Sequence, residues 1–456
     1  MLKDERLHEL ITRGINVAQF VSFGPPDKIR FHGICGLGQS QAPATVESAV
    51  ETIFQSSFLG SIDIRTFLAH KPDGNPFEKD IKTTGAALQL VRKFLGEGYF
   101  VIVSERIPIE GSGRFGGVLL GDIIQGAANE TPRCVDNFEL PLPVLSLSRR
   151  MGLELLQLIY GCVLQFPFAK EDRIEFSVHT GPVGYYRKPQ LIWQVDQYPG
   201  EQVPGAPAPF WPNRISEDMG DKPYGLVMAH LHGLLVPKTS VIGRVFPQFT
   251  FGRHTHSGES LWIRTCPKVQ TPGKYATRRV WEDPFLLMQR EDPDGTKISS
   301  LIVQEGVRSE YAGALLTDAD GKLIIEGKSG EGVLLMIGER GPEELPPRVI
   351  RAVERLYLGA REIFGDIRME WVFDGDEAWC VQIHLGRAAT KDRVIYPGKP
   401  QAWQEFSVLQ GLEALRVLVQ NAQEGEFGIV LRGNVGVTGH FAEILCKAKI
   451  PSRIEP

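Results

Sequence analysis

Apolar and polar positions alternate with the period of β-strands along much of the chain, most clearly in one hairpin-like stretch. Arg368–Phe373 and Ala378–Ile383 are its predicted strands, and Asp374-Gly375-Asp376 supplies the turn. Glu370 and Gln382 interrupt the apolar strands. Across a hairpin, a carboxylate and an amide oxygen can together hold a hard cation such as Mg²⁺. The alternative is that both side chains face solvent on an edge hairpin, as Glu and Gln usually do.

Segments of the first half return in the second half in the same order and at nearly the same spacing. Arg65 and Glu105 are 40 residues apart, and Arg264 and Glu305 are 41 apart. Each match is weak alone, but together they predict a duplicated domain, which implies a shared fold and not that both copies are active. The matched segments are Ser61–Thr66 with Ser260–Thr265, Val103–Glu105 with Val303–Glu305, Gly117–Asp122 with Gly313–Asp318, Arg173–Phe176 with Arg368–Trp371, and Trp193-Gln194 with Val381-Gln382.

A Pro/Gly-rich segment, Tyr198–Pro212, is the best candidate for a domain boundary, since it contains five prolines. We expect an α+β or α/β chain with a first lobe over residues 1–200, a linker over 201–212 and a second lobe over 213–395. Residues 400–456 would form a short C-terminal segment. A long apolar run, Leu145–Cys162, and an amphipathic run, Trp403–Asn421, are predicted helices.

The composition is that of an ordinary globular protein, with 42% hydrophobic and 23% charged residues. A net charge of −5 gives no reason to expect a nucleic-acid or membrane-surface partner. No apolar run approaches the roughly 20 residues that span a bilayer. The six cysteines include no C-x-x-C pair, which argues against a zinc site and a disulfide framework. With no apolar signal-peptide core at the N-terminus, these features predict a cytoplasmic location.

Two basic residues of the second half stand where a phosphate could bind. Lys222 follows a glycine turn at the start of an apolar helical run, and there a lysine and the backbone N–H groups can reach a phosphate. Arg264 lies in the strand Leu261–Thr265, and its planar fork could clamp phosphate oxygens. The alternatives are an exposed lysine in a turn and a structural ion pair.

These motifs and the hairpin resemble the ATP-grasp nucleotide-binding domain of the phosphoenolpyruvate synthase and pyruvate phosphate dikinase family. The resemblance covers roughly residues 213–390. Asp221 replaces a glycine of the family pattern, and His384 replaces an arginine that contacts phosphate. Gly220, Lys222, Leu226, Gly233, Val236 and Pro237 match the G-G-K-A-x-x-L and G-x-x-V-P elements, and Glu370-Trp371 and Gln382-Ile383-His384 match the D-I-E-W and Q-x-R strands.

The resemblance implies an ATP-grasp fold that binds ATP and Mg²⁺. Lys222 and Arg264 would then be catalytic and would bind phosphates, while Glu370 and Gln382 would be the metal ligands. Leu301–Val307 resembles the V-Q-x-M-V hinge, whose backbone reads the adenine edge and whose acid holds the ribose. The other cofactor-binding residues that the resemblance implies are Gln304, Glu305, Val307, Glu326 and His384, with Lys274 and Arg278 as candidates in a basic segment that the family uses as a loop over the phosphates.

A second, thinner resemblance covers residues 428–452. This stretch is similar to the G-G-x-x-S-H-A-A-I-x-A-R-x-x-x-I-P core of the phosphohistidine domain of the same enzymes, and His440 falls on the histidine that carries the phosphoryl group. A neutral imidazole is a competent nucleophile at pH 7, and a helix N-terminus beside it would bind the transferred phosphate. Gly439 replaces the usual serine or threonine. The alternative is a helix-capping histidine without chemistry.

The first lobe is assigned only through the repeat. Arg65, Glu105, Glu175 and Gln194 occupy the matching places, but no glycine turn surrounds Lys3, which is near the position of the phosphate-binding lysine. We therefore expect the first lobe to have lost productive ATP binding.

Three functions remain open. The leading hypothesis is a dikinase-like, ATP-dependent phosphotransferase whose acceptor is unknown. The second is an ATP-grasp ligase that forms an acylphosphate, and the third is a nucleotide-sensing protein without turnover, which His384 keeps open. The chain has no room for the roughly 250-residue TIM barrel of a complete phosphoenolpyruvate synthase.

Overall fold

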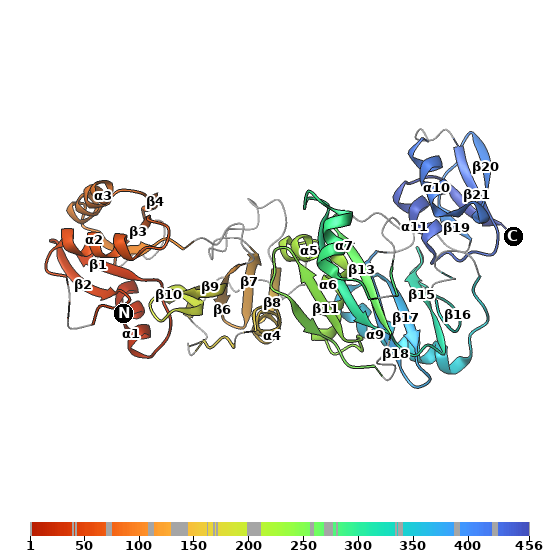
Figure 1. Ribbon diagram of the computed structural model, residues 1–456, viewed down its shortest axis with the longest axis horizontal. Helices are drawn as coiled ribbons and strands as arrows, with labels where there is room; N and C mark the ends of the chain where they lie inside the picture. The colour runs from red at the N-terminus through yellow and green to blue at the C-terminus, as the bar shows by residue number, and fades with distance from the viewer. Residues whose placement is uncertain are drawn as a thin grey trace. The chain divides into compact units, whose positions relative to one another are not determined.

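The protein is described by a computed structural model that divides into two compact units (Figure 1). The first is Met1–Arg214 with Val245–Pro247, and the second is Ile215–Arg244 with Gln248–Pro456. Helices and mainly antiparallel sheets make up both units, so the predicted α+β class is confirmed. The structure describes residues 2–455 apart from 39–40, 42, 70–74, 108–113, 129–144, 162, 167–168, 170–171, 198–210, 256–259, 269–276, 280, 333–334, 336–340, 387–392 and 422–426.

The first unit contains two antiparallel sheets. One consists of β1 (Phe20–Gly24), β2 (Lys28–Gly33), β3 (Ile62–Phe67), β4 (Phe77–Ile81) and β5 (Phe100–Glu105), in the order β2-β1-β5-β3-β4. The other consists of β6 (Phe115–Leu120), β7 (Ile123–Ala128), β8 (Leu145–Ser148), β9 (Asp172–Val183) and β10 (Lys188–Gln197), in the order β10-β9-β6-β7-β8.

Helices cover these sheets through their apolar faces. α2 (Val46–Ser56) and α3 (Thr84–Gly96) pack on the first sheet and on each other, and Ile53 and Val91 are fully buried in the core that they share. Each helix begins at a threonine cap, whose side chain accepts a hydrogen bond from the backbone N–H three residues on. α1 (Lys3–Thr12) contacts β2 and β10, and α4 (Arg149–Tyr160) packs on β7, β8 and β9.

The second unit begins with two further antiparallel sheets. One consists of β11 (Thr239–Gly243), β12 (Phe249–Phe251), β13 (Leu261–Pro267) and β14 (Ile298–Glu305), in the order β12-β11-β14-β13. The other consists of β15 (Tyr311–Thr317), β16 (Leu323–Ser329), β17 (Ile367–Phe373) and β18 (Ala378–Leu385), in the order β16-β15-β17-β18. The helices are α5 (Arg214–Met219), α6 (Asp221–Leu231), α7 (Pro284–Glu291) and α9 (Pro347–Phe364).

A C-terminal module completes the second unit and has its own core. Its strands β19 (Val394–Tyr396), β20 (Ala402–Ser407), β21 (Phe427–Arg432) and β22 (Ser452–Glu455) form a sheet in the order β19-β22-β21-β20. The β20–β21 and β21–β22 pairs are parallel. The helical turn η1 (Val408–Gln410), α10 (Gly411–Gln420) and α11 (His440–Lys447) accompany the sheet, and Leu415 and Phe441 are fully buried in the core.

The two units repeat one strand order. The sequence β2-β1-β5-β3 corresponds, strand for strand along the chain, to β12-β11-β14-β13, and β10-β9-β6-β7 corresponds to β18-β17-β15-β16. The chain therefore contains two tandem lobes of related architecture. Duplication of one ancestral domain stays a prediction, which this matching order supports.

Two sequence-based predictions of helices were too long. Leu145–Ser148 is strand β8, and α4 begins only at Arg149, after the cap Ser148. Likewise, Trp403–Ser407 lies in strand β20, and α10 begins at Gly411. In both cases a short strand pairs with another strand about 20 residues away in the sequence, β8 with β7 and β20 with β21, and this pairing overrides the local apolar pattern. Among the described residues, no helix is both long and apolar enough to span a membrane.

The pH dependence of the first unit should depend on His179, whose side chain is 2% exposed. Burial, with the positive charge of Arg114, lowers the pKa of His179 from 6.5 to about 3. The unfolded chain therefore binds a proton below about pH 6.5 that the folded unit does not take up, and stability falls as the pH drops from 6.5 towards 3. Between pH 7.5 and 5, the free energy of unfolding measured in urea titrations should fall by roughly 1–2 kcal/mol less in His179→Gln than in the wild type. An unchanged loss would contradict this assignment.

Candidate functional site

The β17–β18 hairpin places Glu370 and Gln382 directly opposite each other, as its pattern predicts. Along β17 the burial alternates, so that Ile367, Met369, Trp371 and Phe373 are buried and the intervening residues are less so. Helix α9 packs against this hairpin. Because successive residues of a strand point to opposite faces, Glu370 and Arg368 lie on the other face from Trp371.

That face borders a pocket of about 360 Å³ in the second unit. Residues of the β11–β14 sheet and of the β15–β18 sheet line it, together with loop residues and one residue each from α6, α10 and α11. The structure thus brings eight of the predicted site residues together, although they span more than 200 positions of the sequence. The eight are Lys222, Arg264, Gln304, Glu305, Val307, Glu370, Gln382 and His440.

Lys222 reaches the pocket because of the turn that precedes α6. Gly220 has a φ of 94°, and a Cβ on it would lie 2.9 Å from Cβ of Cys266. Only glycine meets both requirements without strain, so α6 begins at Asp221 and Lys222 falls in its first turn. The turn therefore requires glycine at position 220. It does not require the second glycine of the family pattern, at the position where this chain has Asp221.

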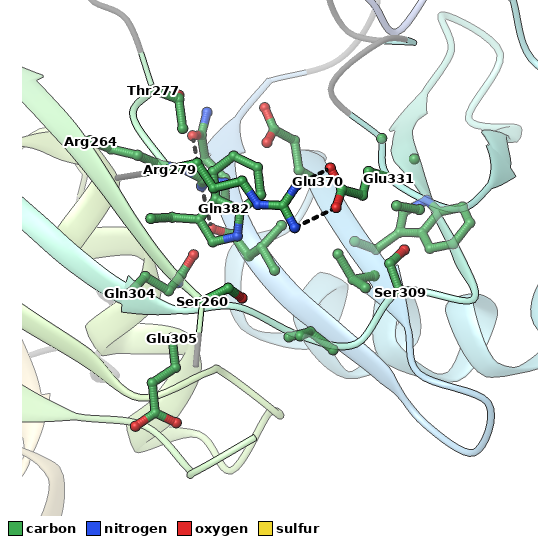
Figure 2. A pocket seen from close by; sticks show the side chains of 18 of the residues that line it. Ser260, Arg264, Thr277, Arg279, Gln304, Glu305, Ser309, Glu331, Glu370 and Gln382 are labelled. Atoms are coloured by element: carbon green, nitrogen blue, oxygen red, sulfur yellow. Dashed lines mark hydrogen bonds and ion pairs between the residues drawn. The ribbon is translucent and has the colours of Figure 1, made fainter. Parts of the chain in front are cut away.

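The charges in the pocket are of both signs. Burial alone would raise the pKa of Glu370, but the positive charges of Arg264 and Lys222 hold it below its usual value, so the carboxylate is ionised at neutral pH. Arg264 donates from Nη1 to the carbonyl of Val381 at 3.0 Å and approaches Oε1 of Gln382 at 3.5 Å. Figure 2 shows Arg264, Glu370 and Gln382 gathered around one space.

The predicted hinge forms one wall, but its acid is engaged elsewhere. Glu305 ends β14, and its carboxylate accepts from the Thr255 N–H at 3.1 Å and lies 3.0 Å from Nδ1 of His254. In Figure 2 this carboxylate points away from Glu370. Gln304 is buried, and its amide donates to Oγ1 of Thr239. The side chain of Glu305 is therefore not poised for a ribose in this conformation.

Two predicted cofactor-binding residues, Glu326 and His384, do not line the pocket. Glu326 instead holds the loop before α11. Its carboxylate accepts from the N–H of Val437 at 3.2 Å, the N–H of Thr438 at 2.9 Å and Oγ1 of Thr438 at 2.6 Å. A Cβ on Gly436 would lie 2.2 Å from Oε2 of Glu326, so this loop and the carboxylate fit closely. No local sequence pattern indicates these partners, since Val437 and Thr438 lie 111 and 112 residues after Glu326.

His384 lies beside the pocket and is neutral. Burial, countered in part by Glu443, lowers its pKa to about 4. Its Nε2 lies 2.6 Å from Nε2 of Gln382. A neutral imidazole can hydrogen-bond to a phosphate or to Gln382, but it does not supply the positive charge of the arginine that it replaces. Here it orients Gln382.

The structure adds Arg279 to the site in place of Arg278. The side chain of Arg278 pairs with Glu282 at 3.2 Å and Glu291 at 3.6 Å, outside the lining. Arg279 lines the pocket, lies 5.3 Å from the ring centroid of Trp262 and pairs with Glu331 at 2.6 Å, as the dashed lines in Figure 2 mark. Lys274 lies outside the described residues. Arg278 forms an isolated antiparallel bridge with Ile263. Neighbouring residues of an extended segment point to opposite sides, and the sequence does not indicate which of the two arginines faces inward.

His440 enters the pocket from the C-terminal module as the first residue of α11. Its Nδ1 lies 3.3 Å from Oε2 of Glu443. Arg368 pairs with Glu443 at 3.4 Å and also donates to the carbonyl of Thr438, so β17 contacts the module directly. The buried thiols nearby are not nucleophiles, since burial raises the pKa of Cys266 to about 11 and that of Cys380 to about 12.

Comparison with known proteins gives no family for this chain. No protein-family model and no curated protein matches it. Among solved structures, it is similar to the L-amino acid ligase of Bacillus licheniformis (14% identity, 41% of this chain and 43% of that chain, TM-score 0.25) and the D-alanine-D-alanine ligase of Helicobacter pylori (9%, 38% and 52%, 0.25). It is also similar to the macrocyclase MdnC of Microcystis aeruginosa (15%, 38% and 53%, 0.23). The chain thus spans about half the length of these structures, and likeness at this level carries no statement about its activity.

We expect the Glu326 contact to protect the loop before α11 from hydrogen exchange. Glu326→Ala would leave the N–H groups of Val437 and Thr438 without their acceptor, and Thr438 is fully buried. Exchange of these two amides should accelerate at least about tenfold, the effect of losing a buried hydrogen bond to a charged group. Glu331→Ala is the control, since its half-exposed ion pair with Arg279 contributes little and lies elsewhere. Equal protection in the two variants would refute the role of Glu326.

Proposed function

We propose that the second unit binds Mg-ATP in this pocket, as an ATP-grasp domain, and transfers a phosphoryl group from it. The observation that supports the proposal is the convergence of two cationic side chains, Lys222 and Arg264, with a carboxylate–amide pair, Glu370 and Gln382, in one cavity. In such an arrangement the cations of the protein face the negative phosphates, and the carboxylate faces the positive metal. A neutral ligand would offer no negative group to Lys222 and Arg264.

The oxygen atoms of Glu370 and Gln382 fit Mg²⁺. Within the described residues, no three His, Cys, Asp or Glu side chains cluster as a complete metal site. Mg²⁺ at nucleotide sites requires no such cluster, because it takes one or two protein oxygens and completes its shell with phosphates and water. When bound, the metal would neutralise part of the charge of the phosphates. Gln382 is held for this role by His384 on one side and Arg264 on the other.

Phosphoryl transfer would depend on the cations of the protein. Lys222, in the first turn of α6, and Arg264, on β13, face the pocket from different elements and could contact different phosphates. Arg279 is a third cation, currently paired with Glu331. An exposed ion pair is worth only about 0–1 kcal/mol, so a phosphate could replace Glu331 as its partner at little cost.

The acceptor distinguishes two forms of this proposal. His440 lines the same pocket as Lys222 and Arg264, which favours transfer to the imidazole. The second candidate is an ATP-grasp ligase that phosphorylates a substrate carboxylate, and two of the similar solved structures are of proteins called ligases. In that form, His440 would contact the acceptor and would not carry the phosphoryl group.

The first unit would not bind ATP productively. Arg65 donates to Gln194 at 3.1 Å and lies 3.9 Å from Glu175, and Arg173 pairs with Glu175 at 2.7 Å. Lys3 pairs with Asp196 at 3.2 Å. Each cation of this cluster already has an acidic neighbour of the same unit, so a nucleotide phosphate would have to displace one.

Lys222→Ala tests nucleotide binding. The loss of one charged contact to a phosphate should weaken Mg-ATP binding by about 10- to 100-fold in calorimetric titrations of the full chain. Lys322→Ala is the matched control, because Lys322 is an exposed lysine in the turn before β16 and lies outside the pocket. Loss of affinity in both variants, or in neither, would contradict the site.

Incubation of the full chain with ATP labelled at the β- or γ-phosphate would identify the reaction. Acid-labile, base-stable label on the wild-type protein and its absence in His440→Ala would establish phosphohistidine, and AMP with phosphate would indicate dikinase chemistry. Release of ADP only when a carboxylic acid and an amine are added would establish the ligase. Tight Mg-ATP binding with no product under any of these conditions would refute catalysis and leave nucleotide sensing.

A further inference from the structure

His440 and Glu443 form a side-chain pair within the first turn of α11. Nδ1 of His440 lies 3.3 Å from Oε2 of Glu443, three residues on and therefore on the same face of the helix. The two side chains are 23% and 17% exposed, so water competes only weakly for this contact. Nδ1 is thus engaged by Glu443 of the same helix. Since His440 lines the pocket, Nε2 is the ring nitrogen that can contact a ligand there.

Glu443 is itself fixed by neighbouring cations. Arg368 on β17 lies 3.4 Å from its Oε2, and Lys447 lies 3.4 Å from its Oε1. Burial alone would raise the pKa of Glu443, but Arg368 and His440 outweigh it and hold the pKa well below its usual value. The carboxylate is therefore anionic and acts only as a hydrogen-bond acceptor.

Glu443 departs from the sequence motif that His440 matches. In the pattern H-A-A-I, isoleucine stands three residues after the histidine, where this chain has Glu443. A carboxylate here is not needed to fold the helix, because the apolar face of α11 is supplied by Phe441, Ala442, Ile444 and Leu445. Besides its ion pairs with Arg368 and Lys447, the carboxylate contacts the imidazole, and this contact bears on the state of the ring.

We propose that Glu443 is a positioning residue for His440. It accepts the Nδ1–H, fixes the neutral ring in that tautomer and leaves the lone pair of Nε2 directed to the pocket. Arg368 supports the arrangement by holding Glu443 and the Thr438 carbonyl from β17. The catalytic part of this inference rests on the proposed phosphoryl transfer, whereas the tautomer of the free protein does not.

The consequence for the transfer step follows from charge balance. The Nε2 lone pair forms the bond to phosphorus, and the phosphorus–oxygen bond to the nucleotide breaks with its electron pair left on the nucleotide oxygen. The proton on Nδ1 stays where it is, so the ring acquires a positive charge as the bond forms. The anionic carboxylate of Glu443 faces that charge, which stabilises the transition state more than the ground state.

The competing interpretation is a structural ion pair. If His440 were protonated on both nitrogens in the free protein, Glu443 would simply neutralise it, and no lone pair would face the pocket. The two cases differ in whether Nε2 of His440 carries a proton, and this protonation can be observed directly.

The first experiment is ¹⁵N NMR of the full chain labelled at histidine, with His440→Ala to identify the signal. At pH 7.5 we expect the neutral tautomer with hydrogen on Nδ1, and a shift towards the Nε2–H tautomer in Glu443→Ala. Glu413→Gln is the control, since Glu413 is an exposed acid on α10 of the same module. An imidazolium, or a tautomer unchanged in Glu443→Ala, would overturn the proposal.

The second experiment measures the labelled transfer in Glu443→Gln, which keeps the size of the side chain and removes its charge. Mg-ATP affinity should be unchanged, while the rate of label transfer to His440 falls about 10- to 100-fold, the share of one charge-assisted hydrogen bond. An unchanged rate in a variant that binds Mg-ATP normally would refute the catalytic role. If the wild type bound no Mg-ATP, the proposed function would fail, and the NMR result alone would decide whether Glu443 positions the ring.

Discussion

One carboxylate, Glu370, balances the charges of the pocket in the second unit. Lys222 and Arg264 approach it from α6 and β13, and without it their positive charges would repel across a partly dry cavity. Its position depends on the backbone pairing of β17 with β18, since a register slip of one residue would turn it to the face that holds Trp371. Strand register thus determines the electrostatics of the site, and the packing of α9 on the hairpin holds that register.

The two units show how one strand order can serve different purposes. In the first unit, Arg65, Glu175 and Gln194 lie at the places of Arg264, Glu370 and Gln382, and the pair Arg173–Glu175 adds a cation of the same unit. Glu105, in the place of Glu305, is buried and accepts two hydrogen bonds from Gln19. Arg65, Arg173 and Glu175 of the first unit thus pair with one another or with Gln194. In the second unit, Lys222 and Arg264 instead face a cavity, the arrangement that a charged ligand would need.

Local sequence patterns predicted the hairpin, because turn residues and period-two alternation determine which side chains share a face. Glu370 and Gln382 are the clearest example. The other predicted residues that line the pocket were expected mainly from the family resemblance. What failed depended on distant partners. Glu326 looked like a ligand-binding acid beside a glycine loop, but its carboxylate is bound by a loop of the C-terminal module. Trp403–Ser407 has a helical pattern and is nevertheless a strand, because β21 offers it a parallel partner. Neither partner leaves a signal within a local window.

The C-terminal module is coupled to the pocket through strands β16 and β17 of one sheet. Arg368 and Glu370 are two residues apart on β17 and therefore share a face, so one strand presents an arginine to α11 and a carboxylate to the pocket. Glu326, on β16 of the same sheet, holds the loop that precedes His440. A displacement of the module would leave the buried Thr438 and the anionic Glu443 without these partners, and unpaired buried polar groups are costly. The sheet that positions Glu370 therefore also positions His440. The separation between the imidazole and the carboxylate is maintained as long as that sheet is intact.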